Sequence, residues 1–384
     1  MTLPLEGVLV ADFSRVLAGP LAAATLADLG AEVIKVERPG VGDDTRHWGP
    51  PWTDNSSSYF ECANRSKRSV ELDLSDPSDL AVAQELASRC DVLIENFRAG
   101  TLARHGLDYE SASARNRGVV YASITGFGAT RGADLAGYDF LVQAVGGLMS
   151  ITGPPGEPTK AGVALVDVLT SKDAVVGILA ALRAREVIGR GQHVEVNLLS
   201  SLLGSLANQA SSYLATGEVP EAMGNRHPSI APYETLRAGD GHVAVCCGND
   251  AQFGRLAAAI GRPELAEDPR FAANADRVAH RDELVAALED ALGADDVARW
   301  VQRLRAAGLP VGPVGTLADG LELATRLGLQ PTVDVGPQSP PQVRSPLTFS
   351  ETPVTDYAAP PRLGEHNAVV REKFQPQPSQ ESQT

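Results

Sequence analysis

The strongest constraint on this chain is an alternation of short apolar segments with helical segments from the N-terminus to about Asn197. Six segments have the length and composition of buried strands: Val8–Phe13, Ala31–Glu37, Ser69–Leu74, Asp91–Phe97, Val119–Gly128 and His193–Asn197. Between and after them, helical patterns cover Leu21–Leu29, Pro77–Arg89, the start of a helix at Gly100–His105, Tyr138–Met149, the segment after Asp167, and Leu198–Leu214. Strands that alternate with helices predict a parallel sheet, here a doubly wound, Rossmann-like α/β domain.

The loops that follow the strands are the expected ligand-binding edge of such a sheet. They carry Arg15–Gly19, Arg38, Asn96–Phe97 and Phe127–Gly128. The first strand is followed by SRVLAGP rather than by a G-x-G-x-x-G turn, and no P-loop pattern is present. A dinucleotide site of the usual kind is therefore not expected.

From the whole sequence we predict three domain-level segments. Residues 1–215 form the large α/β domain, 216–325 a smaller α+β domain with its linkers, and 326–384 a Pro-rich return segment that packs on the large domain. In the smaller domain we expect a strand at GHVAVCC, helices at Gln252–Ile260, Glu283–Leu292, Asp295–Ala307 and Leu317–Leu327, and a turn at LPVGPV. GEHNAVVREKF is expected to form a last short helix, and the final QPQPSQESQT to be disordered.

Charge and composition exclude several classes of function. The formal net charge of -15 argues against nucleic acid as a partner, because phosphate binding needs a basic surface. The N-terminus shows no signal peptide and no apolar run reaches membrane-spanning length, so we expect a cytoplasmic protein without a membrane partner. The four cysteines show no metal-ligand spacing, and no metal is expected.

Asp167 is the one acidic residue in an apolar run, at the point where a long helix should begin. One interpretation is structural: an ionised carboxylate is favoured at a helix N-terminus, as an N-cap or first-turn acid. The other is chemical: a carboxylate that is ionised at neutral pH can act as a nucleophile without a general base and form a covalent acyl intermediate. Spacing alone leaves both open.

Several stretches together resemble the family III CoA-transferases, the group that contains formyl-CoA transferase, carnitine CoA-transferase and the acyl-CoA racemases. The matching stretches are DFSRVLAGP, LGAEVIKVERPGVGDDTR, ANRSKRSVELDL, DVLIENFRAGTLARHGL, SITGFG, GYDFLVQAVGGLMSITG, the Asp167 segment, IGRGQHVEV and MGNRHPSIAPYE. They span most of the chain, and as a set they are highly specific.

The resemblance implies that Asp167 is the nucleophile, which receives an acyl group from an acyl-CoA and then carries CoA as a thioester until a small carboxylic acid takes it. It implies CoA contacts at the matching positions, which are Val16, Ala18, Arg38, Leu72, Asn96, Phe97 and Arg104. It also implies a homodimer with two subunits interlaced like chain links.

Within the family, transfer and racemisation both remain possible activities. The racemases carry a histidine after SITGFG as a proton-transfer base, whereas this chain has Tyr138, a poor base at neutral pH. Tyr138 therefore favours transfer and is expected to act in or line the pocket. Leu17 stands where formyl-CoA transferase has a glutamine, so formyl or oxalyl specificity is not expected. Ser171–Lys172 departs from the family pattern just after the catalytic turn, which leaves a CoA-binding protein without turnover as an alternative. Several stretches most resemble transferases acting on dicarboxylates with succinyl-CoA as donor, and Arg46 or Arg226 could meet the distal carboxylate.

Overall fold

The computed structural model describes residues 2–337 and 339–375. The described chain forms two compact units. The first comprises residues 2–148, 161–217 and, apart from residue 338, 330–375, and the second comprises Met149–Lys160 and Glu218–Leu329. These units differ from the expected domains at Met149–Lys160, which the sequence assigned to the large domain.

A six-stranded parallel sheet forms the centre of the first unit, with the order β3-β2-β1-β4-β5-β6. Its strands are β1 Leu9–Asp12, β2 Glu32–Glu37, β3 Lys67–Glu71, β4 Val92–Glu95, β5 Val120–Thr125 and β6 His193–Asn197. All six expected strands are confirmed, although β3 begins two residues before the expected Ser69. Its first residue, Lys67, is charged and would be expected in an exposed loop. It is buried instead, because its ammonium lies 2.8 Å from the Asp12 carboxylate.

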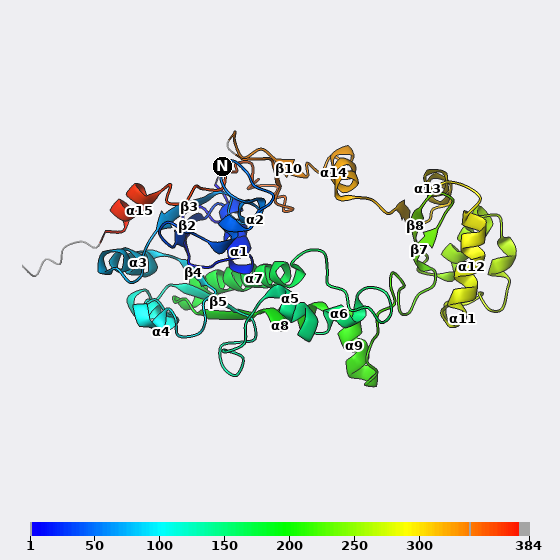
Figure 1. The fold of residues 1–384 in the computed structure, drawn as a ribbon, viewed down its shortest axis with the longest axis horizontal. Helices are drawn as coiled ribbons and strands as arrows, with labels where there is room; N and C mark the ends of the chain where they lie inside the picture. Colours follow the sequence, from blue (N-terminus) through cyan, green and yellow to red (C-terminus); the bar gives the residue numbers. More distant parts are fainter. Residues whose placement is uncertain (1, 338, 376–384) are drawn as a thin grey trace, which may run out of the picture. The chain divides into compact units, whose positions relative to one another are not determined.

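Helices cover both faces of this sheet (Figure 1). One face packs against α1 Ala18–Asp28, α7 Leu165–Ile188 and α8 Leu198–Ser205, and the other against α3 Pro77–Arg89, α4 Tyr109–Arg115 and α15 Asn367–Lys373. Shorter elements of this unit are η1 Asp44–His47, α2 Ser58–Glu61, η2 Ala103–His105, α5 Asp139–Val145 and α9 Ala207–Thr216. Helix α6, Leu148–Ile151, begins in the first unit and continues into the second.

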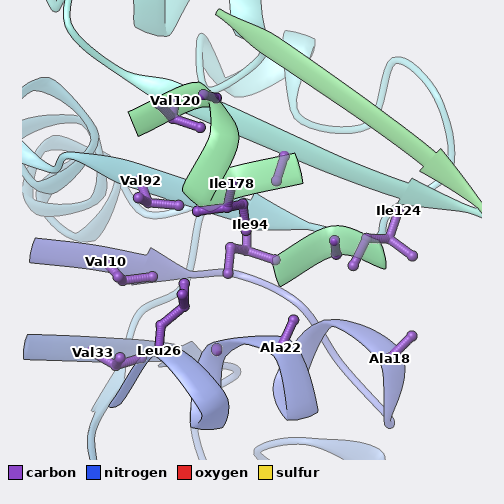
Figure 2. Close-up of a cluster of buried hydrophobic side chains, with 14 of the residues drawn as sticks. Val10, Ala18, Ala22, Leu26, Val33, Val92, Ile94, Val120, Ile124 and Ile178 are labelled. Carbon is purple, nitrogen blue, oxygen red and sulfur yellow. The ribbon is translucent and has the colours of Figure 1, made fainter. Parts of the chain in front are cut away.

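Along the four central strands β1, β2, β4 and β5, alternating side chains belong to two separate cores. Figure 2 shows one core, in which strand valines meet helix residues: Val10, Val33, Val92 and Val120 with Leu26 of α1 and Ile178 of α7. The neighbouring strand positions, such as Ala11, Ile34 and Leu93, lie in the core beneath α3. A sheet buried on both faces is a rigid support for the loops at its edge.

Three expected helices are shorter than predicted or broken. Tyr138–Met149 splits into α5 and α6, because Gly147 has a φ of 89°, outside the helical region. Leu198–Leu214 splits into α8 and α9 at Ala207, which has a φ of 42°. Gly100–His105 forms only the single 3₁₀ turn η2.

The second unit has an antiparallel sheet of order β7-β8-β9 with its own hydrophobic core. Its elements are β7 Tyr233–Arg237, β8 His242–Cys246, α10 Asp250–Ala259, η3 Pro263–Ala266, α11 Asn274–Ala279, α12 Arg281–Leu292, α13 Val297–Ala306, β9 Val311–Pro313 and α14 Leu317–Arg326. The expected strand at β8 and the helices at α10, α12, α13 and α14 are confirmed. The predicted turn at LPVGPV is wrong, because it contains β9; this strand ends in Pro313 at the sheet edge, where a missing N–H is tolerated.

Residues 330–375 belong to the first unit and include β10 Thr332–Val333, β11 Gln342–Val343 and α15. This segment runs along the exposed edge of β3: Ser66 donates its N–H to the Ala358 carbonyl (3.0 Å) and His366 to that of Ser69 (2.9 Å). Covering an edge strand protects its backbone groups from pairing with other chains. The expected disorder of the final QPQPSQESQT concerns residues that, from Pro376 on, lie outside the described part of the chain.

Candidate active site

A cavity of about 230 Å³ lies at the carboxyl edge of the parallel sheet, beside the point where the strand order reverses between β1 and β4. The residues of interest that line it come from the β1–α1 loop, the end of β4, the β5–α5 loop and the start of α7: Arg15, Val16, Leu17, Ala18, Asn96, Phe97, Tyr138, Asp139 and Asp167. We call it the Asp167 cavity. The fold thus brings the loops after three strands and the start of α7 to one site.

Asp167 lies in the first turn of α7 but does not cap the helix. The N-cap position belongs to Ala164, which offers no side-chain acceptor. The cap comes from α5 instead: Oδ1 of Asp139 accepts the N–H of Val166 at 2.7 Å and that of Asp167 at 3.3 Å. Among the residues that the structure describes, none donates a hydrogen bond to the half-buried Asp167 carboxylate, which therefore faces the cavity without a protein partner.

The environment of Asp167 raises its pKa to about 7. Burial is the main cause, because it disfavours the charged form, and the nearby negative charge of Asp139 adds to it. The expectation that Asp167 is fully ionised at neutral pH is therefore wrong: a substantial fraction of this carboxyl group is protonated there. A strongly perturbed carboxyl group in a cleft is typical of functional sites.

Two tyrosines accompany Asp139 and Asp167, which we call the acidic pair. Tyr138 precedes α5, lines the cavity and is 63% exposed. Tyr59 of α2 was not singled out from the sequence; burial, followed by the charges of Asp167, Cys62 and Asp139, raises its pKa to about 12. A phenol with this pKa stays protonated and can donate a hydrogen bond. No sequence pattern singles out Tyr59; in the structure its ring packs edge-on against that of Trp48, with the ring centroids 5.2 Å apart.

The loop between β1 and α1 is held by side chains from neighbouring strands. The Asn96 side chain accepts the Arg15 N–H at 2.8 Å and donates to the Arg15 carbonyl at 2.7 Å. Gly19 is needed at the helix start, because a Cβ there would lie 2.3 Å from the Cβ of Ser14. The N–H groups of Leu17 and Ala18 have no hydrogen-bond partner among the described residues, so the start of α1 presents donors at the cavity.

A second cavity of about 510 Å³ adjoins the first, since Arg15 and Phe97 line both; we call it the β2–β3 cavity. Arg38 and Leu72, two of the expected CoA contacts, lie in its wall. The Arg38 guanidinium is 2.6 Å from Asp44, which also lies 3.3 Å from the Arg15 guanidinium. The structure thus divides six of the seven expected CoA contacts between two adjoining cavities.

The expected CoA contact at Arg104 lies elsewhere. Arg104 is exposed on η2 and lines neither cavity, although its neighbour His105 lines the β2–β3 cavity.

The arginines suggested for a distal carboxylate are already paired. Arg46 is buried, donates to Glu37 at 2.7 and 2.8 Å and to the Pro361 carbonyl, and lines neither cavity. Arg226, in the second unit, pairs with Glu234 and Asp282.

Ser171 and Lys172, the departures from the family pattern, do not line the Asp167 cavity. The Ser171 hydroxyl donates within α7 to the Val168 carbonyl at 2.7 Å, and Lys172 is exposed.

Within residues 2–337 and 339–375, no group of three or more His, Cys, Asp or Glu side chains is arranged to hold a metal ion. None of the helices in this part of the chain is long and apolar enough to cross a bilayer.

Comparisons with known proteins give a consistent result. A family model described as CoA-transferase family III matches residues 5–367. The chain is 42% identical to a succinate–glutarate CoA-transferase of Agrobacterium fabrum, over 96% of this chain and 94% of the relative. It is 40% identical to a succinyl-CoA:glutarate CoA-transferase of Mus musculus, over 96% of this chain and 85% of the relative. Its structure is similar to that of a CAIB/BAIF family protein from Brucella suis, with a TM-score of 0.89, 44% identity and coverage of 97% and 100% of the two chains.

Proposed function

Because the chain belongs to CoA-transferase family III and these enzymes move CoA between carboxylic acids, we propose that it transfers CoA through covalent intermediates on Asp167. The main support for the proposal is the arrangement of Asp139 and Asp167. Asp139 caps α7, so the Asp167 carboxylate points into a cavity at the sheet's ligand-binding edge with no hydrogen bond from the described residues.

The proposed reaction begins with attack of an Asp167 oxygen on the thioester carbonyl of the donor. The C–S bond breaks, CoA leaves as a thiolate, and a mixed anhydride forms between Asp167 and the acyl group. The thiolate then attacks Cγ of Asp167, the donor acid leaves as a carboxylate, and an aspartyl-CoA thioester remains.

The second half repeats these steps with the acceptor. The acceptor carboxylate attacks Cγ of Asp167, releases the thiolate and forms a new anhydride. The thiolate attacks the acceptor's acyl carbon, which yields the new acyl-CoA and restores the Asp167 carboxylate. Each step exchanges one activated acyl bond for another, so no external energy source is needed, although water must be excluded.

Neighbouring groups can stabilise the negative charge that develops on the attacked carbonyl. The unpaired N–H groups of Leu17 and Ala18 at the start of α1 have the character of an oxyanion-binding site. Tyr59, kept protonated by its raised pKa, is a further donor near Asp167. In this proposal Tyr138 lines the acyl end of the pocket and donates a hydrogen bond, rather than acting as a base.

The two adjoining cavities support an extended position for CoA. In this arrangement Val16, Ala18, Asn96 and Phe97 contact the part of CoA that leads to Asp167, and Arg38 and Leu72 contact the nucleotide end in the β2–β3 cavity. Arg104 would reach the nucleotide from the exposed η2. An arginine beside such a cavity suits a phosphate or a nucleobase.

We further propose succinyl-CoA as donor and a dicarboxylic acid as acceptor. The support is that relatives with 40–42% identity over nearly the whole chain are named as succinate–glutarate transferases. In a screen of acyl-CoA donors against mono- and dicarboxylic acids, we expect succinyl-CoA with glutarate to give kcat/KM values of at least about 10⁴ M⁻¹s⁻¹. Hydroxylamine trapping during turnover should modify Asp167, as read by mass spectrometry.

Two outcomes would contradict this function. CoA binding without any Asp167 adduct or transfer would show a binding protein without turnover. Deuterium incorporation at the α-carbon of a 2-methylacyl-CoA, in deuterium oxide and without an acceptor acid, would show a racemase.

We also propose that the protein is an interlaced homodimer. The support is exposed apolar surface: no residue of α14 is buried, its Leu317 is 83% exposed, and Phe140 beside the Asp167 cavity is 59% exposed. We expect light scattering to give twice the chain mass of 40.3 kDa. Interlaced chains cannot exchange without unfolding, so tagged and untagged forms should make mixed dimers when co-expressed but not when mixed afterwards. An active monomer would contradict the proposal.

A further inference from the structure

The turn between β1 and α1 holds a β-branched residue in a conformation that such residues rarely adopt. Val16 has a φ of 71°, in the left-handed region, where its side chain clashes with its own backbone. A strained residue of this kind persists only when its surroundings enforce the conformation, and such residues cluster at ligand sites. Val16 lines the Asp167 cavity, so the contacts that enforce its conformation bear on function.

A buried ion pair lies against this turn. The Val16 N–H is 3.3 Å from both carboxylate oxygens of Asp43, which is only 1% exposed. Asp43 also accepts the Lys35 ammonium at 2.9 Å, and that ammonium donates to the Ser14 carbonyl at 3.1 Å. The pair therefore holds the turn on both sides of Arg15, whose own backbone is fixed by Asn96.

The same pair forms part of the wall between the two cavities. Lys35 and Asp43 line the β2–β3 cavity, Val16 lines the Asp167 cavity, and Arg15 lines both. A shift of the turn would change the shape of both cavities together.

Asp43 also makes contacts that suit a purely structural role. Its carboxylate accepts the N–H and the hydroxyl of Thr45, at 3.0 and 2.8 Å, and so caps η1. A cap of a four-residue helix does not need a contact to Val16, nor a buried lysine that bonds Ser14. A buried ion pair is also weak evidence for stability, because desolvation of both charges opposes their attraction.

We propose that Asp43 is a positioning residue that, together with Lys35, holds the strained Ser14–Leu17 turn in the shape that receives the CoA substrate. The inference rests on the proposed function, since it assumes that the two cavities bind CoA. Asp43 acts through the backbone of Val16 and touches no reacting atom.

The test compares the full-length protein with Asp43→Asn, by calorimetry with CoA and by transfer kinetics. We expect a rise of about tenfold in the dissociation constant for CoA and in KM for acyl-CoA, with kcat within about threefold. Asp28→Asn is the matched control: Asp28 is a buried carboxylate 2.6 Å from Arg65 that lines neither cavity. It should lower the melting temperature without changing CoA affinity.

A rescue experiment distinguishes a positioning role of Asp43 from a purely stabilising one. Glycine adopts a positive φ without strain. Val16→Gly should therefore restore the CoA affinity of Asp43→Asn to within about threefold of that of Val16→Gly alone. Unchanged CoA affinity in Asp43→Asn, or no rescue by Val16→Gly, would overturn the inference. If Asp43→Asn does not fold, Asp43→Glu keeps the charge beside Lys35 but displaces the oxygens, and it is judged by the same two criteria. Calorimetry needs no turnover, so a wild-type protein that binds CoA without transfer refutes the proposed function while the Asp43 comparison still stands.

Discussion

Replacing Asp167 by asparagine should abolish CoA transfer, with kcat lowered by about 10⁴-fold or more. Asparagine has nearly the same shape as aspartate, but its amide cannot form the anhydride and thioester on which the proposed reaction depends. CoA binding should persist, because the two cavities remain intact. The loss should therefore appear in kcat and in the hydroxylamine adduct, and the dissociation constant for CoA should change by less than about threefold.

The control for this substitution is Asp173→Asn, which changes an exposed carboxylate on the same helix. It should leave kcat within about twofold of the wild-type value.

The pH dependence of the free energy of unfolding gives a second test of Asp167. Folding raises the pKa of Asp167, so the folded state binds this proton more tightly than the unfolded state and loses stability as the pH rises toward about 7. Asp167→Asn should thus melt no lower than wild type at about pH 8. Transfer activity that survives in Asp167→Asn would refute the nucleophile.

The sequence predicts the centre of the parallel sheet well because β1, β2, β4 and β5 are largely buried and most of their residues are apolar. Val92–Glu95 and Val120–Thr125 need no long-range information to be recognised. The start of β3 could not be found in this way. Lys67 resembles a loop residue until Asp12, 55 positions earlier, supplies its buried counter-charge.

Some features of the candidate site can likewise be predicted from the sequence, and others appear only in the folded structure. The site's location at the loops that follow the strands could be predicted from the alternation of strands and helices, and the unusual placement of Asp167 is visible in the sequence. The role of Asp139 is not, because an acid in GYDFLV is an ordinary first-turn residue of its own helix until α5 packs against the start of α7. The ionisation of Asp167 could not be predicted either, because a reference pKa ignores burial, the larger cause of the shift, and the second carboxylate that the fold brings close.

The acidic pair leads to the second large expected effect, a dependence of acylation on pH. Only the anionic form of Asp167 attacks, and its pKa is about 7. The rate of the first acylation by succinyl-CoA, in single-turnover experiments, should therefore rise about tenfold between about pH 6 and pH 8. The free carboxylate of the donor titrates near the glutamate reference of about 4.3, below this window.

Asp139→Asn tests the cause of this shift. The substitution removes the negative charge that adds to the effect of burial, while its amide oxygen can still accept the Val166 N–H and keep α7 capped. The midpoint of the acylation profile should move below about pH 7 yet stay above the ordinary aspartate value of about 3.9, because burial, the larger cause, remains. Acylation near pH 6 should then be faster in the variant than in the wild type, an unusual gain that loss of structure cannot produce. An unchanged midpoint would show that Asp139 caps the helix without tuning the nucleophile, and a wild-type rate independent of pH would show that Asp167 is already ionised throughout.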